Sequence, residues 1–280
     1  MIGEEISAVV CTWNAEQSIG PCLKSLVDVK IGEIILVDAN SDDNTRQIAG
    51  SYTDLIYEDP RKGLAAARNI GIAKASKPYI LNFGCDNVLE ENTLELMYNE
   101  LLNNSWTGVS AMTRLASKDN YFSFALDLYK KARYFPGERD VIGTPTLFRR
   151  SDLQNNPYDP NMGWSDDGDL CHRLRVSGGR FCIANTFVRE IGSETYSSIK
   201  TRWLGYGRSD YETYNKYSPH WSYSRKIISF LYPFNNELIN PIRRLMGADK
   251  LKVLPFLILI TMVRYIGWIK YFQKERFTEK

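Results

Sequence analysis

The chain has 280 residues, of which 44% are hydrophobic and 24% are charged, and its formal net charge is +2. This composition is typical of a globular protein and excludes an intrinsically disordered chain. The small net charge gives no support to a nucleic-acid partner. The five cysteines form neither a C-x-x-C pair nor a zinc-finger spacing, which favours free thiols in a reducing compartment over a disulfide framework.

The first hundred residues alternate short apolar runs with amphipathic segments. The apolar runs predict strands at residues 6–11, 33–38, 54–57 and 79–83, and the segments between them predict helices at about 19–27, 63–75 and 91–102. Continuously apolar strands separated by helices are typical of a parallel sheet with right-handed crossovers. We therefore predict an α/β fold.

Polar side chains follow three of these predicted strands. Thr12 and Asn14 come after the first, Asp38 and Asp42 end the second, and Asp86 follows the fourth. One such turn could be ordinary loop chemistry. Because ligands of open α/β sheets bind beyond the carboxyl ends of the strands, three turns at one edge predict a binding site.

From residue 105 the alternation loosens. We predict strands at 107–113, 146–148 and 180–183, with an aromatic stretch at 121–124 between the first two. No repeat or low-complexity linker interrupts the chain, and we predict one domain over residues 1–220 followed by a helical, membrane-proximal region over 221–280.

Three carboxylates stand within four positions at the start of a predicted helix. Leu170 and Leu174 mark its buried face. Asp166 and Asp169 then share a neighbouring face, while Asp167 points roughly 100° away. Helix capping would need only one carboxylate, so the surplus predicts an acid–base or metal role.

Residues 251–269 are almost all apolar and are broken by Lys252, Pro255, Thr261 and Arg264. This length is at the lower limit for crossing a bilayer. Basic residues flank the run on both sides, namely Arg243, Arg244, Lys250, Lys252, Lys270, Lys274 and Arg276. Basic flanks on both sides suit a helix lying in the membrane interface at least as well as a spanning one. The alternative is that residues 251–269 form a helix buried against the domain. At the other end of the chain, the acidic N-terminus shows no signal-peptide pattern.

Four motifs in this order and spacing together resemble glycosyltransferase family 2, the inverting enzymes of the GT-A fold. The similar region covers residues 5–210, and its motifs lie at residues 10–16, 37–45, 63–71 and around Asp167. The resemblance implies a Rossmann-like, mostly parallel sheet flanked by helices, with a C-terminal helical membrane-associated region.

The resemblance also implies a nucleotide site. It places the nucleotide near Thr12, Asn14, Glu16, Asp38, Asp42 and Arg68, with Asp38 accepting a hydrogen bond from the base. An exposed helix arginine is the alternative role for Arg68, and Asn69 and Gly71 could shape the helix instead of touching a ligand.

Asp86 matches the last acid of the family's metal-binding Asp-x-Asp motif, which implies Mg²⁺ or Mn²⁺ as the cofactor. Gly84 stands where the first acid is expected and supplies no ligand. The histidine ligand of many relatives is also missing from residues 187–190, where Glu190 is a candidate substitute. Metal dependence is therefore an open question at the level of sequence.

Asp167 matches the family's catalytic base, with Asp166 in the position of the preceding Glu. Further along, Arg202 and Arg208 are candidate diphosphate contacts. Trp203 could stack on a sugar or belong to the core. Ile199 replaces the Gln of the processive motif Gln-x-x-Arg-Trp, which argues against a polymerising enzyme.

Together these features predict an inverting, non-processive glycosyltransferase. We expect it to move a sugar from a nucleotide-diphosphate donor to an acceptor glycan or a lipid-linked acceptor at the cytoplasmic face of a membrane. We expect residues 251–269 to contact the membrane, so that the protein is either peripheral or held by a single anchor. A nucleotide-sugar-binding scaffold without catalysis is the alternative, motivated by Gly84. A nucleotidyltransferase would need a glycine-rich phosphate loop after the first strand, which residues 12–16 do not form.

Overall fold

The computed structural model describes residues 2–278, and it describes the surroundings of side chains up to residue 273. The side chains of Lys274 and Arg276, predicted as basic flanks, lie outside the described part. The chain forms two compact units. Unit 1 contains residues 1–116, 135–161 and 166–192, and unit 2 contains residues 117–134, 162–165 and 193–280. The predicted domain boundary at residue 220 falls within unit 2 and stays a prediction.

Unit 1 is built on a nine-stranded sheet. Its strands are β1 (Ile6–Thr12), β2 (Glu33–Asp38), β3 (Ile56–Glu58), β4 (Tyr79–Gly84), β5 (Asn87–Leu89), β6 (Gly108–Leu115), β7 (Gly137–Arg139), β8 (Thr146–Arg149) and β9 (Phe181–Glu190). Eight of them follow the spatial order β3-β2-β1-β4-β8-β6-β9-β5, and β7 pairs with β9. The predicted strands in the first hundred residues are present, whereas the short strands β5 and β7 were not predicted.

The sheet is mixed rather than mostly parallel. β1 pairs in parallel with β2 and with β4, and β2 pairs in parallel with β3, as the alternating sequence predicts. In the rest of the sheet, β8 runs antiparallel to both β4 and β6, and β5 and β7 run antiparallel to β9. Only β6 and β9 are parallel there. The parallel prediction therefore holds for the N-terminal half of the sheet.

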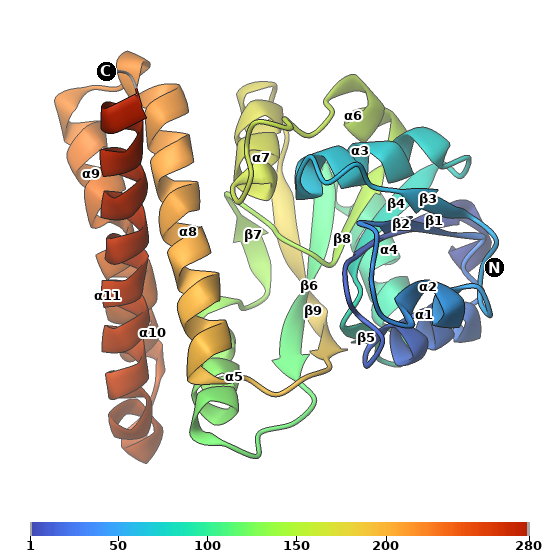
Figure 1. Ribbon diagram of the computed structural model, residues 1–280, viewed down its shortest axis with the longest axis horizontal. Coiled ribbons are helices and arrows are strands. Elements are labelled where there is room, and N and C mark those ends of the chain that lie inside the picture. The colour runs from blue at the N-terminus through green and yellow to red at the C-terminus, as the bar shows by residue number, and fades with distance from the viewer. Residues whose placement is uncertain (1, 279–280) are drawn as a thin grey trace. The chain divides into compact units, whose positions relative to one another are not determined.

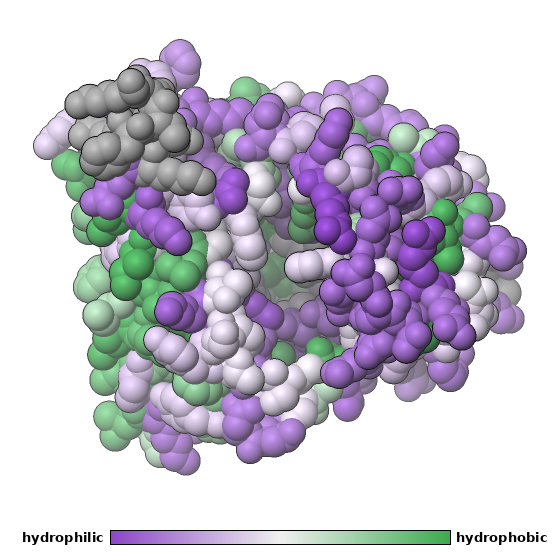
Figure 2. All heavy atoms as spheres, in the orientation of Figure 1, coloured by the Kyte–Doolittle hydropathy of each residue, from purple (hydrophilic) through white to green (hydrophobic). Residues whose placement is uncertain are grey.

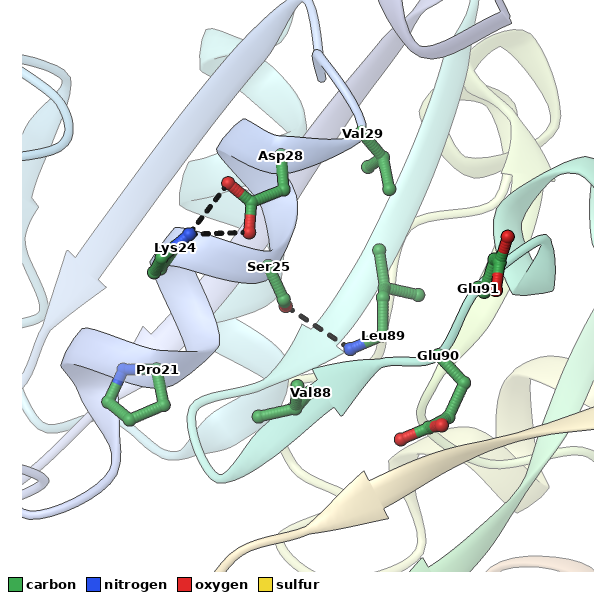
Figure 3. A pocket seen from close by; sticks show the side chains of 9 residues that line it. All are labelled: Pro21, Lys24, Ser25, Asp28, Val29, Val88, Leu89, Glu90 and Glu91. Carbon is green, nitrogen blue, oxygen red and sulfur yellow. Dashed lines mark hydrogen bonds and ion pairs between the residues drawn. The ribbon is translucent and has the colours of Figure 1, made fainter.

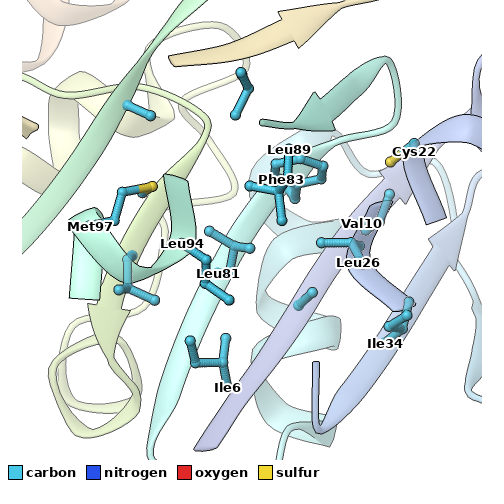
Figure 4. Close-up of a cluster of buried hydrophobic side chains, with 14 of the residues drawn as sticks. Ile6, Val10, Cys22, Leu26, Ile34, Leu81, Phe83, Leu89, Leu94 and Met97 are labelled. Carbon is cyan, nitrogen blue, oxygen red and sulfur yellow. The ribbon is translucent and has the colours of Figure 1, made fainter. Parts of the chain in front are cut away.

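Helices cover both faces of this sheet (Figure 1). In unit 1 they are η1 (Ile2–Glu5), α1 (Ile19–Asp28), α2 (Thr45–Ala49), α3 (Leu64–Lys74), α4 (Thr93–Asn103), α6 (Arg150–Asn155) and α7 (Asp166–Val176). α1 and α4 bury their apolar sides in one large core, part of which Figure 4 shows, with Val10 and Leu81 of the strands facing Leu26 and Leu94 of the helices. Removing this apolar surface from water is the main stabilising contribution to such a fold.

α3 packs on the other face of the sheet, against β1 and β2. Its contact is close at Gly71, where an added Cβ would lie 2.3 Å from Cγ1 of Val9. A larger residue would push α3 off the strands, so a structural role explains Gly71 and no ligand is needed for it. The close approach fixes the position of Arg68, which lies one turn earlier on the same helix.

Unit 2 is helical. Its elements are α5 (Tyr121–Arg133), α8 (Tyr196–Tyr217), η2 (Ser218–His220), α9 (Tyr223–Pro233), the π-helical segment η3 (Phe234–Ile239), α10 (Asn240–Arg244) and α11 (Gly247–Thr278). The aromatic stretch at 121–124 is the first turn of α5. Within α11, residues Gly247–Gln273 are long and apolar enough to cross a membrane, and 44% of their most apolar window is buried within the protein.

Candidate functional site

The ends of β2, β1 and β4 lie side by side, as the sequence predicts. The register pairs Thr12 with Asp38 and Cys11 with Gly84, so the polar turns that follow these strands share one edge of the sheet. Burial raises the pKa of the Cys11 thiol to about 12, and the positive charge of Arg68 partly opposes this rise. The end of β1 therefore lies within electrostatic reach of α3.

Asp38 is fully buried at this edge and holds a defined set of hydrogen bonds. Its Oδ1 accepts from the hydroxyl of Thr12 at 2.9 Å and from the hydroxyl of Ser41 at 2.6 Å. Its Oδ2 accepts from the backbone N–H of Ser41 at 3.0 Å. A buried carboxylate held by three donors is oriented rather than free to rotate, and it keeps acceptor capacity for one further donor.

The loops after β1 and β2 are tied together by their own polar side chains. Oδ1 of Asn14 accepts from the backbone N–H of Asp42 at 3.0 Å, and the N–H of Asn14 donates to Ser41 Oγ at 2.9 Å. Glu16 accepts from the backbone N–H of Asn44 at 3.1 Å. Asn14 and Glu16 thus hold the shape of this double loop, while the Asp42 side chain is exposed to solvent.

Arg68 joins α3 to the start of α7. Its Nη1 donates to Oδ2 of Asp166 at 2.6 Å and to Oδ1 of Asp167 at 2.8 Å. Its Nη2 donates to the hydroxyl of Thr144 at 2.6 Å, and its guanidinium lies over the ring of Tyr158, 5.1 Å from the ring centroid. Arg68 is therefore buried among carboxylates and is not an exposed helix arginine.

The two acids differ in exposure as the helix geometry predicts. Asp166 and Asp169 are buried, whereas the Asp167 side chain retains 25% of its accessible surface. Burial and the neighbouring charge of Asp167 raise the pKa of Asp166 to about 7, although Arg68 opposes this rise. Asp169 is paired with Arg173 one turn later on α7, at 2.8 Å, which supports a structural role for Asp169.

Asn69, next to Arg68 on α3, fixes the segment that carries Tyr158. Its Nδ2 donates to the carbonyl of Tyr158 at 2.8 Å, and its Oδ1 accepts from the N–H of Tyr158 at 3.0 Å. Sequence reasoning did not identify Thr144 or Tyr158, because they lie 76 and 90 residues from Arg68 in a segment without a recognisable motif. Ser41 lies inside the predicted nucleotide motif, so its contact to Asp38 could have been anticipated.

Asp86 lies beyond the end of β4. Its Oδ1 accepts from the side chain of Asn87 at 3.1 Å, and its carbonyl accepts from the N–H of Ile191 at 2.7 Å. Because Asn87 also pairs with Glu190 across β5 and β9, the strand register places Glu190 near Asp86. An added Cβ at Gly84 would lie 2.8 Å from Oδ1 of Asp86, so an acid at this position would displace the Asp86 side chain.

Over the described residues, no group of three or more His, Cys, Asp or Glu side chains could hold a metal ion. Mg²⁺ is commonly held by one or two carboxylates together with substrate phosphates, and Asp86 with its neighbour Glu190 fits that smaller requirement.

The remaining predicted residues belong to unit 2. Arg202 is paired with Glu194 at 2.7 Å, and Arg208 is paired with Glu212 at 2.6 Å. Trp203 is buried, and its indole N–H donates to Glu237 at 3.1 Å, which corresponds to the core alternative for this residue.

A pocket of about 370 Å³ lies between α1 and β5 in unit 1 (Figure 3). Lys24 and Asp28 on its rim are bonded to each other, and the hydroxyl of Ser25 donates to the carbonyl of Cys22 and accepts from the N–H of Leu89. Its lining contains none of the predicted site residues. We therefore do not assign the function to this pocket.

The comparisons with known proteins agree on one family. The model described as "Glycosyl transferase family 2" matches residues 7–156, which is more than half of the chain. A cholesterol galactosyltransferase of Borreliella burgdorferi is 29% identical over 102 residues, covering 34% of this chain and 28% of that protein. The lipopolysaccharide core biosynthesis glycosyltransferase LpsC of Rhizobium meliloti is 31% identical over 98 residues, covering 33% and 35%. The matches thus span only about a third of these relatives.

A third relative and two solved structures are also similar to this chain. The β-1,3-glucosyltransferase WfgD of Escherichia coli, named for UDP-Glc and α-D-GlcNAc-diphosphoundecaprenol, is 28% identical over 106 residues, covering 36% of this chain and 42% of that protein. Among solved structures, S. aureus TarS in complex with UDP-GlcNAc covers 96% of this chain and 92% of its own, with a TM-score of 0.54 and 14% identity.

Glucosyl-3-phosphoglycerate synthase of Mycobacterium tuberculosis, solved with Mg²⁺ and UDP, has a TM-score of 0.56 and 15% identity, and covers 77% of this chain and 83% of its own. At such identities the likeness concerns the fold alone. The predicted GT-A-like fold, with one apolar C-terminal helix, is confirmed.

Proposed function

The chain belongs to glycosyl transferase family 2, and on this premise we propose that it transfers a sugar from a nucleotide-diphosphate donor to an acceptor with inversion at the anomeric carbon. In this reaction an acceptor oxygen attacks the anomeric carbon. The bond to the diphosphate oxygen breaks, and the acceptor proton passes to a carboxylate. A single displacement of this kind inverts the anomeric centre.

Asp167 is the proposed base. The observation that carries this assignment is the pairing of two consecutive carboxylates with Arg68, of which Asp167 alone is accessible from solvent. Asp166 is buried beside the same guanidinium and is disposed to hold a proton near neutral pH. Arg68 fixes the orientation of the pair, and an oriented carboxylate is what general-base catalysis requires.

The donor nucleotide would bind at the edge formed by β1, β2 and β4. Asp38, oriented by Thr12 and Ser41, is the proposed acceptor for a donor group of the base. Asn14, Glu16 and Asp42 belong to the double loop that would surround the nucleotide. Arg68 would act on the donor through its electrostatic field, because Nη1 already donates to both carboxylates and Nη2 donates to Thr144.

Asp86, with Glu190 beside it, would hold Mg²⁺ or Mn²⁺ together with the donor phosphates. When bound, the cation supplies charge neutralisation for the departing diphosphate. Asp166 contributes through the carboxylate pair that it forms with Asp167 at Arg68. The role of Arg202 and Arg208 at the diphosphate or the acceptor stays a prediction from the sequence, and both are paired with glutamates within unit 2.

A lipid-linked acceptor and membrane contact through residues 251–269 are the finer parts of this proposal. They are supported by the apolar helix α11 and by relatives that are named for cholesterol and for a diphosphoundecaprenol-linked sugar as acceptors. The cytoplasmic face is the proposed location. Ile199, in place of the glutamine of processive relatives, supports a single transfer.

A thermal-shift panel of nucleoside diphosphates, with and without Mn²⁺, tests donor binding first. Binding to the native state raises the melting temperature by mass action, so the cognate nucleotide should give a saturable rise. The cognate donor should then release nucleoside diphosphate in the presence of an acceptor. A protein that is stabilised by nucleotide but releases no diphosphate from any donor would support the scaffold alternative.

A further inference from the structure

Helix α11 presents an exposed apolar stripe along its length. The stripe consists of Leu251, Pro255, Ile258, Met262, Ile266 and Ile269. Their spacing of three or four residues keeps them on one helix face. The opposite face, which includes Val253, Phe256 and Ile260, is buried within unit 2. Because α11 is apolar on its exposed face as well as on its buried face, part of its apolar surface is left in contact with water, which is unfavourable.

The buried face of α11 is bound to α8 by contacts that a spanning helix could not keep. Arg264 of α11 forms a bidentate ion pair with Asp210 of α8, at 2.7 and 2.8 Å, and also pairs with Glu237 of η3. An added Cβ at Gly207 of α8 would lie 2.0 Å from the carbonyl of Arg264, and one at Gly267 would lie 2.4 Å from the carbonyl of Leu204. The two helix backbones are therefore in direct contact.

This packing argues against α11 crossing a bilayer. If α11 crossed, α8 would have to cross with it or lose the contacts with Asp210 and the glycines. α8 is strongly polar, and its charged residues are Lys200, Arg202, Arg208, Asp210, Glu212 and Lys216. Several charges at the centre of a bilayer are expensive, and breaking a buried ion pair is costly as well. A helix lying in the interface keeps its protein-facing side and buries only the exposed stripe.

Helix α9 adds a second exposed apolar stripe to unit 2. Tyr223, Ile227 and Phe230 are exposed at intervals of three or four residues, and the exposed Leu231 and Phe234, the latter at the start of η3, continue the stripe. α9 contacts α11, where the hydroxyl of Tyr265 donates to the carbonyl of Phe230 at 2.8 Å and the two rings lie 5.5 Å apart. Figure 2 shows hydrophobic side chains gathered along the side of unit 2 that carries α9 and α11 in Figure 1.

Basic side chains stand at the ends of both stripes. Arg225 lies in the first turn of α9, Lys250 and Lys252 lie in the first turns of α11, and Lys270 follows Ile269. All four side chains are exposed, and so are Arg243 and Arg244 before α11. An apolar face bordered by lysine and arginine matches the interface of a membrane that contains anionic lipids.

We propose that the exposed faces of α9 and α11 form a monotopic lipid-binding surface that seats unit 2 in the headgroup region of an anionic bilayer. The surface buries the two stripes to the depth of the acyl boundary and leaves α8 on the protein side. This inference deepens the membrane contact of the proposed function and rests on unit 2 alone, so it does not depend on the assignment of Asp167.

Flotation of the full chain with vesicles tests the surface. The wild-type protein should float with vesicles of phosphatidylcholine and phosphatidylglycerol, float less with phosphatidylcholine alone, and be released by alkaline carbonate. The variant Ile258→Glu/Met262→Glu should bind these vesicles at least about tenfold more weakly, since it places two charges on the apolar face. Both side chains are exposed, so folding should survive, as circular dichroism would check.

Leu96→Glu/Leu102→Glu is the matched control, because both leucines are exposed on α4 of unit 1 and the change in charge is the same. It should bind vesicles like the wild type. The proposal is overturned if the wild type binds neither vesicle, if the α11 variant binds as the wild type does, or if carbonate fails to extract the bound protein, which would mean a spanning helix. A dimer in lipid-free solution that the α11 variant dissociates, without lipid binding by the wild type, would assign the surface to a second copy. The nucleotide-induced rise in melting temperature tests the proposed donor site, independently of vesicle binding.

Discussion

Nη1 of Arg68 lies 2.8 Å from Oδ1 of Asp167 and 2.6 Å from Oδ2 of Asp166, so one buried nitrogen serves two consecutive carboxylates. A single positive charge cannot compensate two negative ones in a buried site. The exposed carboxylate keeps contact with water, and the buried one tends to retain a proton. This difference in exposure and protonation distinguishes Asp167, the proposed base, from Asp166.

Arg68 should be needed for folding as well as for catalysis. Arg68→Met removes the cation and leaves two acids uncompensated, so we expect the free energy of unfolding to fall by about 3 kcal/mol. Arg68→Lys keeps the charge but cannot bridge Asp166, Asp167 and Thr144 with a planar fork, so the variant should fold and lose turnover. Urea unfolding and diphosphate release measure the two effects.

Arg175→Lys is the control for Arg68→Lys, because Arg175 is largely exposed and pairs with the exposed Asp140. It should match the wild type in stability and rate. Wild-type turnover in Arg68→Lys would contradict the role of Arg68 in orienting Asp167.

Asp166 should make stability depend on pH. Its pKa is raised from 3.8 to about 7 in the folded protein, so between these values the native state binds more protons than the unfolded state. The free energy of unfolding then falls as pH rises from about 4 to about 7 and is level above that. Asp166→Asn is neutral throughout and should lose this slope.

The measurement is urea unfolding of both proteins at pH 5 and pH 8. Relative to the wild type, Asp166→Asn should gain about 3 kcal/mol between these two pH values. An unchanged difference between the two proteins across this range would show that Asp166 is ionised in the folded state at pH 5.

Asp38 should contribute to donor binding. Asp38→Asn cannot accept from the backbone N–H of Ser41 through its amide nitrogen and carries no charge, so we expect nucleoside diphosphate to bind about tenfold more weakly. Titration calorimetry measures the dissociation constant, and unfolding curves report any loss of stability. Asp28→Asn, at an exposed ion pair on α1, serves as the control. Equal affinity in a folded Asp38→Asn protein would remove Asp38 from the nucleotide site.

Metal dependence tests the role of Asp86. EDTA should lower diphosphate release at least about tenfold, and Mn²⁺ should restore it, because the donor's diphosphate needs charge neutralisation as it leaves. Asp86→Asn should raise the Mn²⁺ concentration required for half-maximal rate, whereas Glu91→Gln, at an exposed position next to α4, should not. A rate that EDTA leaves unchanged would show that protein cations alone stabilise the leaving group.

The sequence predicts the parts of the fold that depend on local periodicity. β1, β2 and β4 are apolar runs ending in polar turns, and the spacing of Leu170 and Leu174 places Asp167 apart from Asp166 and Asp169, as the structure confirms. The antiparallel strands β5 and β7 have three residues each, and they form because β9 offers them an edge. Such short strands carry no periodic signal of their own.

The partners of Arg68 could not be predicted for a different reason. Asp166 and Asp167 lie almost a hundred residues away along the chain, and tertiary packing, including the close contact of α3 with β1 at Gly71, brings them to Arg68. The sequence motif identified Arg68 as a site residue but assigned it to the nucleotide. The sequence does not distinguish a sugar-stacking role for Trp203 from a core role, because an isolated tryptophan in an amphipathic helix suits both.

The most direct test of the account compares diphosphate release from the cognate donor, with acceptor present, in the wild type, Asp167→Asn and the control Asp28→Asn. The amide keeps the size of the side chain but cannot take the proton of the acceptor. We expect Asp167→Asn to fold, to bind nucleoside diphosphate as the wild type does, and to lose about a thousandfold in rate, while Asp28→Asn keeps the wild-type rate. Turnover by Asp167→Asn within a few-fold of the wild-type rate would contradict the assignment of Asp167 as the base.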